Sequence, residues 1–529
     1  AQVRRPHSRQ RSGRLPHRTP LPDAAKGAMA PVWNVAALAY GMLPAPSATP
    51  GRSLTLSQLP QNIVDVEYAV RGEMDLIAQE LKEKLKQKDH GLPFDEIVAC
   101  NIGNPQALGQ APVSFHRQVL SLLTNPELQD KDLYAGDVHD RARLFTNATT
   151  FGAYSHSKGA DLLRKYVADF ITRRDGAQLP PADPDSIYLT DGASPAVKLS
   201  LSLLVGGPDD GVLLPVPQYP LYSAALTNLG GSAVGYYLDE DNGWSVKMDE
   251  VEEAVARFRA ERPKGRVRAM VLINPGNPTG NVMSREQMEA VVTMCYENGI
   301  VILADEVYQE NIWSKTKKWE SFRKVAHEMN VPVEIVSFHS ISKGYYGECG
   351  LRGGYMHLEN IDQQVQSQLY KLVSMTLCSN TMGQAMTASM MNPPAEGDSS
   401  FELFRAERTA ILESLHRKSL MVSKRLDSLP GMSCQPIDGA MYAFPRVELP
   451  AAALKAAKDA GRTPDLFYCI AMLQETGIVV VPGSGFHQRP GTWHFRITIL
   501  PAEAKLPALL DRLESFHRAF MARYAKDEL

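Results

Sequence analysis

The sequence lacks the cysteine pairs that usually bind zinc or exchange disulfides. Its cysteines are scattered, and no two of them form a C-x-x-C pair. Zinc binding and thioredoxin-like chemistry therefore have no support, and we predict no metal site. The pattern favours free, mostly buried thiols in a reducing compartment. The residues concerned are Cys100, Cys295, Cys349, Cys378, Cys434 and Cys469.

Long apolar runs and an excess of charge of one sign are also missing. The longest apolar stretch, residues 32–43, is interrupted by Asn34 and is shorter than the roughly 18 residues of a membrane span. The formal net charge is −3, so the chain as a whole carries no basic field that would attract nucleic acid. We therefore expect neither membrane nor nucleic acid as a partner.

Acidic residues are absent from the first 22 residues, which contain six arginines and two histidines. Such a leader is typical of an organelle transit peptide, and we expect a mitochondrial targeting segment within residues 1–55. Two alternatives stay open. The chain begins with Ala1, so the leading residues could be a fragment or precede a start at Met29, which fits a cytoplasmic protein. Residues 32–43 could instead belong to a secretory signal, because residues 526–529 spell the ER-retention string K-D-E-L.

Short β-rich runs alternate with helical patterns in the middle of the chain. This alternation predicts an α/β fold, in which a mainly parallel sheet is flanked by helices and ligands bind at the carboxyl ends of the strands. We expect strands at residues 186–190, 211–214, 234–238, 268–273, 300–304 and 334–338, and helices at 160–174, 195–205, 248–262 and 284–298.

A smaller α+β region is expected towards the C-terminus. A loop at 393–400 precedes a long helix at 401–429, and the strands that follow surround another helix. We predict an N-terminal arm with part of a small domain at 56–150, a large domain at 151–392 and a C-terminal small domain at 393–529. The remaining elements expected are a helix at 74–88, strands at 440–444, 478–481 and 493–500, and a helix at 465–475.

Two polar motifs follow predicted strands of the larger region. Asp191 to Ser194 precede a helix that Pro195 is expected to open, and a helix N-terminus with small residues binds anions such as phosphate. A plain capped turn is the alternative. Residues 274–280 (N-P-G-N-P-T-G) constrain the backbone with two prolines and two glycines, which would hold a polar side chain rigidly at the end of its strand. A simple turn is the alternative there.

Two further motifs complete a set that fits one cofactor. Asp305 ends an apolar strand, where a buried carboxylate needs a partner such as a protonated ring nitrogen. The alternative is a helix cap. Lys343 lies among small hydroxyl residues and could form a Schiff base, while Ser340 and Arg352 could hold a phosphate. A solvated surface lysine is the alternative.

The order of these motifs resembles that of the fold-type I, class I/II aminotransferases, and within them the alanine aminotransferase branch. N-P-x-N-P-T-G is followed by D-E-x-Y and then by S-x-S-K with a later arginine. The likeness covers about residues 55–524. It is also carried by residues 101–106 (N-I-G-N-P-Q), 154–159 (Y-S-H-S-K-G), 217–222 (P-Q-Y-P-L-Y) and 339–350 (H-S-I-S-K-G-Y-Y-G-E-C-G).

The resemblance implies a seven-stranded, mainly parallel sheet and pyridoxal 5′-phosphate (PLP) as cofactor. Lys343 would bind the cofactor covalently and then move a proton, and Asp305 would pair with the ring nitrogen. Asn277 and Tyr308 would donate to the phenolate oxygen of the cofactor, and Tyr219 would stack on its ring. The phosphate would be held by Ala193 N–H, Ser194, Ser340 and Arg352, and by Tyr154 of the partner subunit in a homodimer.

Arg496 lies amid apolar neighbours in a predicted strand, so its burial calls for an anion. The resemblance implies that Arg496 clamps the substrate α-carboxylate, that Gly103 lets the backbone approach the same group and that Asn277 also belongs to the substrate site. A structural arginine paired with an internal acid is the alternative.

These roles together imply a ping-pong reaction that moves the amino group of L-alanine to 2-oxoglutarate, giving pyruvate and L-glutamate. Small amino acids and 2-oxo acids are thus the expected partners. A glutamate:glyoxylate aminotransferase of the same branch, a fold-type I PLP lyase and a non-catalytic binding protein remain alternatives.

Overall fold

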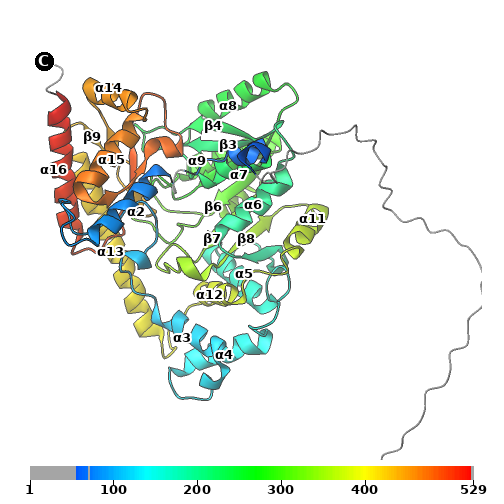
Figure 1. The fold of residues 1–529 in the computed structure, drawn as a ribbon. Helices are drawn as coiled ribbons and strands as arrows, with labels where there is room; N and C mark the ends of the chain where they lie inside the picture. The colour runs from blue at the N-terminus through cyan, green and yellow to red at the C-terminus, as the bar shows by residue number, and fades with distance from the viewer. Residues whose placement is uncertain (1–54, 69–71, 526–529) are drawn as a thin grey trace, which may run out of the picture. The chain divides into compact units, whose positions relative to one another are not determined.

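A seven-stranded sheet runs through the centre of residues 59–529 in the computed structural model of this chain (Figure 1). The strands lie in the order β2-β8-β7-β6-β5-β3-β4, and only β8 runs antiparallel to its two neighbours. The prediction of a mainly parallel seven-stranded sheet is confirmed. The strands are β2 Ile187–Thr190, β3 Asp210–Val216, β4 Ser232–Tyr237, β5 Arg266–Ile273, β6 Val301–Asp305, β7 Ile335–Ser340 and β8 Gly354–Glu359.

The structure describes residues 55–68 and 72–525. Except for Thr55, the predicted targeting segment and the K-D-E-L string lie outside the described residues. Residues 1–58 form a separate unit, of which the structure describes a short 3-10 turn, Leu56–Gln58. Among the helices of the described ranges, none combines the length and the apolar character needed to cross a membrane.

Helices cover both faces of the sheet because the buried strands are apolar on both sides. In β5, Ala269 and Val271 pack with α6, α7 and α11, whereas Met270 and Leu272 pack with α8, α9 and α10. This continuous apolar pattern is typical of a parallel strand that is covered on both faces. The helices are α6 Ala193–Leu204, α7 Leu221–Leu229, α8 Met248–Glu261, α9 Arg285–Asn298, α10 Phe322–Met329 and α11 Gln363–Ser374.

A second set of helices packs against the β2 end of the sheet. The apolar faces of α3 Ser114–Thr124, α4 Gly136–Ala148, α5 Asp161–Asp175 and α12 Thr381–Met391 share one core cluster. The long helix α13, Phe401–Asp427, contributes Phe404 to this cluster and Val422 to the C-terminal core.

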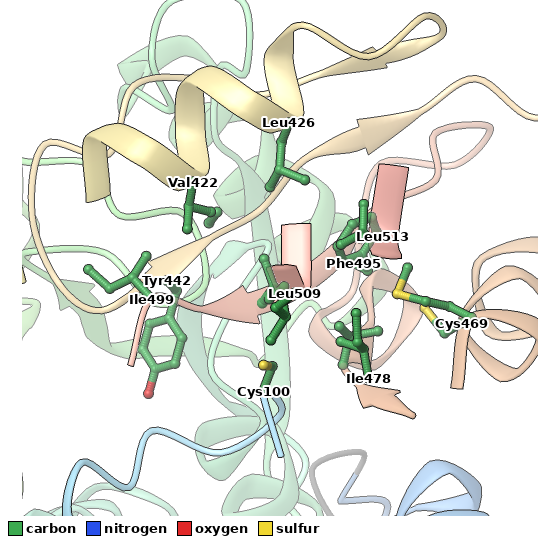
Figure 2. Packing of buried hydrophobic residues seen from close by; sticks show 14 of the residues in the cluster. Cys100, Val422, Leu426, Tyr442, Cys469, Ile478, Phe495, Ile499, Leu509 and Leu513 are labelled. Carbon is green, nitrogen blue, oxygen red and sulfur yellow. The ribbon is translucent and has the colours of Figure 1, made fainter. Parts of the chain in front are cut away.

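The C-terminal α+β region has its own core, which Figure 2 shows. Val422 and Leu426 of α13 point towards Phe495 and Leu509 there. Three short antiparallel strands lie in the order β10-β14-β13 (Tyr442–Ala443, Phe495–Thr498 and Val481–Pro482). The other elements are α1 Gln61–Val64, α2 Glu73–Leu85, α14 Ala451–Asp459, α15 Pro464–Thr476, α16 Leu506–Ala525, and the strand pairs β1 Val98–Ala99 with β12 Ile478–Val479 and β9 Met432–Ser433 with β11 Arg446–Val447.

Most predicted elements are present, with shifted ends. Helix α6 begins at Ala193 rather than at Pro195, which lies in its first turn. The strand expected at 478–481 is two short strands with different partners, and β8 was not predicted. All six cysteines are free, as predicted, and Cys100, Cys295, Cys434 and Cys469 are buried.

Candidate active site

The carboxyl ends of β5, β6 and β7 border a cavity of about 310 Å³. Eleven of the predicted site residues line it, although they are spread over nearly 400 residues of sequence. The twelfth, Tyr154, does not line the cavity in this chain, and its side chain is 78% exposed. The eleven are Gly103, Ala193, Ser194, Tyr219, Asn277, Asp305, Tyr308, Ser340, Lys343, Arg352 and Arg496.

A larger cavity of about 490 Å³ lies at the opposite, amino ends of the same strands. Its lining combines leucines and valines with Arg259, Arg266 and Arg268 and contains no lysine, cysteine or histidine. The smaller cavity combines a lysine amine, a buried carboxyl group and an uncapped helix N-terminus, so it is the candidate active site.

Lys343 lies in the loop that follows β7, and its side chain is half-buried. Its Nζ donates to the carbonyl oxygen of Gly103 across 2.6 Å. The loop is fixed on both sides of the lysine. Ser342 N–H donates to Ser340 Oγ, and Gly344 N–H donates to Asn311 Oδ1 at 2.9 Å. The alternative of a freely solvated lysine therefore does not hold.

Asp305 is buried at the end of β6 and accepts a hydrogen bond from the Tyr222 hydroxyl at 2.8 Å. Within the described part of the chain it forms no ion pair with a basic side chain. Burial raises the pKa of Asp305 to about 6, although the hydrogen bonds from Tyr222 and Val307 and the charge of Lys343 oppose that rise. A cation entering the cavity beside this carboxyl group would compensate for the burial.

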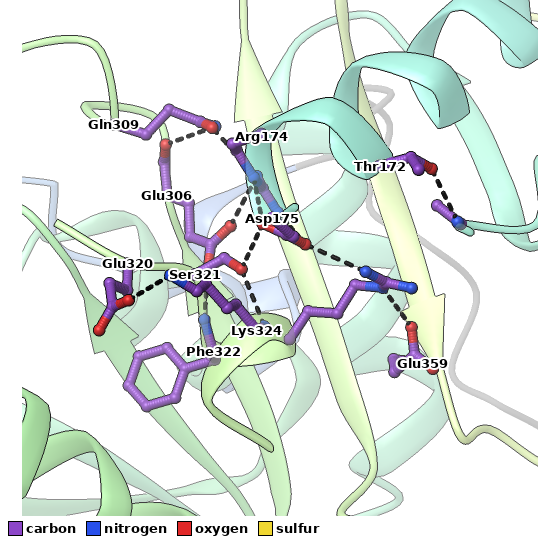
Figure 3. A network of polar contacts seen from close by, with 12 residues as sticks. Thr172, Arg174, Asp175, Glu306, Gln309, Glu320, Ser321, Phe322, Lys324 and Glu359 are labelled. Carbon is purple, nitrogen blue, oxygen red and sulfur yellow. Dashed lines mark hydrogen bonds and ion pairs between the residues drawn. The ribbon is translucent and has the colours of Figure 1, made fainter. Parts of the chain in front are cut away.

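Glu306, the next residue after Asp305, points away from the cavity into a buried network of charged side chains (Figure 3). Arg174 lies 3.4 Å from Glu306, while Arg323 bridges Asp175 and Glu359. Burial raises the pKa of Glu306 to about 7, and the charge of Arg174 opposes that rise. The network ties α5 and α10 to the ends of β6 and β8, and so holds the strand that carries Asp305.

Arg496 is buried on β14, and among the described residues no carboxylate forms an ion pair with it. Nη1 donates to Asn277 Oδ1 at 2.9 Å and Nη2 donates to the carbonyl oxygen of Asn101. The guanidinium lies between the rings of Tyr442 and Phe486, at 4.3 and 4.8 Å from their centroids. Its hydrogen-bond partners are an amide and a carbonyl oxygen rather than a carboxylate, so the described residues do not support the alternative of an arginine paired with an internal acid.

The N-terminus of α6 lines the same cavity with Ala193 and Ser194. Gly192 precedes the helix with a φ of 93°, and no side chain caps the first turn. Arg352 packs against this turn, where a Cβ on Gly192 would lie 2.8 Å from Arg352 Nη2. The free N–H groups, the helix dipole and the guanidinium together favour a phosphate-sized anion.

The aromatic lining includes residues that sequence reasoning missed. Tyr219 shares a 2.9 Å hydrogen bond with Tyr68, and Tyr308 donates to the hydroxyl of Tyr442 at 3.0 Å. Cys349 and Tyr442 also line the cavity, and Tyr222 supports Asp305 from behind. The sequence offers little sign of Tyr442, because a tyrosine in a predicted strand is usually a residue of the apolar core.

Comparisons with known proteins identify the family of this chain. A family model described as aminotransferase class I and II matches residues 125–513. The chain belongs to this family. It is 47% identical over 490 residues to alanine aminotransferase 2, mitochondrial, of Arabidopsis thaliana, covering 91% of this chain and 90% of the relative. It is 46% identical over 483 residues to human alanine aminotransferase 1, and the match covers 89% of this chain and 96% of the human protein.

Solved aminotransferase structures share the architecture. An aminotransferase from Escherichia coli has a TM-score of 0.67 and 25% identity, covering 88% of this chain and 99% of that one. An alanine aminotransferase from Pyrococcus furiosus has a TM-score of 0.69 over 87% and 100% of the two chains, and at 23% identity it supports the fold alone. This aminotransferase therefore has the fold-type I architecture.

As a member of this family, the aminotransferase depends on PLP, and its cavity fits that cofactor. The buried Asp305 carboxyl group matches a protonated ring nitrogen. The uncapped turn of α6 with Arg352 matches the phosphate, and the Lys343 amine lies in the same cavity. Asn277 uses its oxygen for Arg496, which has only donors, so its NH₂ group remains to donate to a phenolate oxygen.

Proposed function

We propose that this enzyme transfers the amino group of L-alanine to 2-oxoglutarate, giving pyruvate and L-glutamate. The observation that carries the proposal is one cavity lined by a lysine amine, a buried acid and an arginine without a carboxylate partner among the described residues. The relatives from Arabidopsis thaliana and Homo sapiens, which are named alanine aminotransferases, support alanine as the donor.

In this proposal Lys343 would hold the cofactor, and its free amine would take the proton from the substrate Cα. PLP, when bound, supplies an electron sink for the pair left behind when the Cα–H bond breaks. Asp305 keeps the ring nitrogen protonated, which makes that sink stronger. Asn277 and Tyr308 would donate to the phenolate oxygen, for which Tyr308 would turn its one O–H away from Tyr442, and Tyr219 would stack on the ring.

The substrate carboxylate is bound by Arg496 and by the backbone at Gly103. Nε of the guanidinium has no hydrogen-bond partner among the described residues and remains to donate to a carboxylate, and two aromatic rings flank the group. Fixing the carboxylate orients the Cα–H bond towards Lys343.

The phosphate is bound by Ala193 N–H, Ser194, Ser340 and Arg352, with Tyr154 of the partner subunit completing the site. A tyrosine that is 78% exposed in one protomer is available for such a contact. The proposal therefore includes a homodimer, which sedimentation would test. Tyr154→Phe should weaken PLP retention in the dimer.

We assign the protein to the mitochondrion as part of the same proposal. The acid-free, arginine-rich leader supports this, and relatives from Arabidopsis thaliana and Dictyostelium discoideum are named mitochondrial. Cell fractionation with sequencing of the mature N-terminus tests it against the cytoplasm and the ER lumen.

The decisive experiment has two arms. Borohydride reduction of the enzyme with PLP, followed by peptide mapping, should place the label on Lys343, and Lys343→Ala should lose both label and turnover. Pyruvate release from alanine is then measured with 2-oxoglutarate or glyoxylate as acceptor. A label elsewhere would overturn the site, and turnover with glyoxylate from glutamate but without alanine would overturn the substrate assignment.

A further inference from the structure

The hydroxyl of Tyr442 lies at the meeting point of three groups of the cavity. Tyr308 donates a hydrogen bond to it at 3.0 Å, and the guanidinium of Arg496 lies 4.3 Å from its ring centroid. A Cβ built on Gly103 would lie 2.1 Å from Tyr442 Oη and 2.9 Å from Lys343 Nζ, so the hydroxyl and the amine lie against the same glycine.

Two different parts of the fold fix this position. Tyr442 belongs to β10, which pairs with β14, the strand of Arg496, so one small sheet carries both residues. In Figure 2 the phenol oxygen points away from Val422 and Leu426, out of the apolar core that anchors the ring. The side chain is 2% exposed, and a polar group held there without a partner would be costly.

Electrostatics give this hydroxyl an acceptor role. Burial alone would raise the pKa of Tyr442, but the charges of Lys343 and Arg496 and hydrogen bonds from Tyr308 and Lys343 together lower it. Burial and the contact with Tyr442 raise the pKa of Tyr308 well above its ordinary value. Of the two phenols, Tyr308 is the donor in their hydrogen bond, and the Tyr442 oxygen accepts.

We propose that Tyr442 is a positioning residue for the Lys343 amine in the proton transfer. A neutral amine has two N–H groups and one lone pair. The Gly103 carbonyl takes one N–H at 2.6 Å, and the Tyr442 oxygen, which lies against the same glycine, is the acceptor proposed for the other. The lone pair is then left to face the cavity, where the Cα–H bond of the substrate is broken. The inference rests on the proposed function, because it assumes that Lys343 is the base.

Tyr442→Phe tests this role, because phenylalanine keeps the ring beside Arg496 and removes the acceptor. We expect kcat with alanine to fall about 10- to 100-fold, as for a misplaced catalytic group, and KM to change less than about 3-fold. The isotope effect on kcat with α-deuterated alanine should increase, because proton transfer then limits the rate. Tyr296→Phe, at an exposed tyrosine of α9, is the matched control and should change neither quantity.

A spectroscopic measurement separates positioning from a purely structural role. The visible absorption of bound PLP depends on the proton at the Lys343 nitrogen, and an acceptor beside that nitrogen stabilises its protonated form. In Tyr442→Phe the absorption change should therefore move to lower pH, while thermal unfolding and PLP retention stay near the wild-type values.

The outcomes separate the role of Tyr442 from the proposed function. If borohydride labels Lys343 but Tyr442→Phe leaves both the isotope effect and the absorption transition unchanged, the role of Tyr442 is overturned and the proposed function stands. If the label misses Lys343 in the wild type, the proposed function itself fails.

Discussion

Arg496 holds the side-chain oxygen of Asn277, with 2.9 Å between Nη1 and Oδ1. The pair joins the C-terminal α+β region to the loop after β5, so the predicted carboxylate clamp and a predicted cofactor ligand share one hydrogen bond. Neither residue can be displaced without moving the other.

Arg496→Lys should weaken substrate binding more than it slows the chemistry. Lysine keeps the charge but lacks the planar set of N–H groups that holds Asn277 and a carboxylate together. We expect KM for alanine and for 2-oxoglutarate to rise about 100-fold, on the order of 3 kcal/mol of charged hydrogen bonds. Initial rates over both substrates measure this, with Arg405→Lys in an exposed ion pair as control. Unchanged KM values would rule out the clamp.

The central sheet and the residues at its carboxyl edge were predictable because they depend on local pattern. Strands β3, β5 and β6 contain continuous apolar runs, and a polar residue at the end of such a run, like Asp305, must face a ligand or a partner. Strand β8 escaped prediction because its sequence, Gly354–Glu359, begins with glycine and contains a histidine and a glutamate. The polar groups of His357 and Glu359 have their partners in the charge network, which the hydrophobic periodicity of the sequence does not reveal.

The supporting residues of the site were missed for the same reason. Tyr308 and Tyr442 are 134 residues apart and Tyr222 and Asp305 are 83 apart, so each contact exists only after the fold has formed. Asp305 and Glu306 are adjacent in sequence but face a cavity and a charge network respectively. Successive residues of a strand face opposite sides, so the two acids point apart once β6 is paired with β5 and β7.

Gly103→Ala should reduce activity through a collision with catalytic groups rather than through the substrate alone. The added Cβ would lie 2.1 Å from Tyr442 Oη, and such overpacking typically costs about 1–3 kcal/mol. We expect kcat/KM to fall at least about 100-fold, since the Lys343 amine must also shift. Adding Tyr442→Phe removes the nearest atom, so the double variant should be less impaired than the product of the single effects. Strictly multiplicative losses would contradict this contact.

Arg323→Met should destabilise the fold from within the charge network. Arg323 is 1% exposed and bridges Asp175 and Glu359, so its removal leaves buried carboxylates with fewer donors. We expect a loss of about 3 kcal/mol, near the lower end for a broken buried pair, because Arg174 still holds Asp175. Thermal unfolding of the enzyme with PLP measures the loss. Arg405→Met, on the surface, should stay within about 0.5 kcal/mol of the wild type.

Asp305→Asn should stabilise the cofactor-free protein at neutral pH while weakening PLP binding. Burial raises the pKa of Asp305 to about 6, above its ordinary value of 3.8, so the folded state binds this proton more tightly than the unfolded state. The stability from that proton is complete below about pH 4 and is lost as the pH rises through about 6. At pH 7.5 the wild type therefore bears a cost of about 3 kcal/mol that the amide avoids.

Thermal unfolding of both cofactor-free proteins at pH 4 and pH 7.5 should show the variant gaining stability only at the higher pH. With PLP present the order should reverse, because the amide offers no charge to the ring nitrogen. An equal difference at both pH values would mean that the carboxyl group is not the buried acid that the cofactor neutralises.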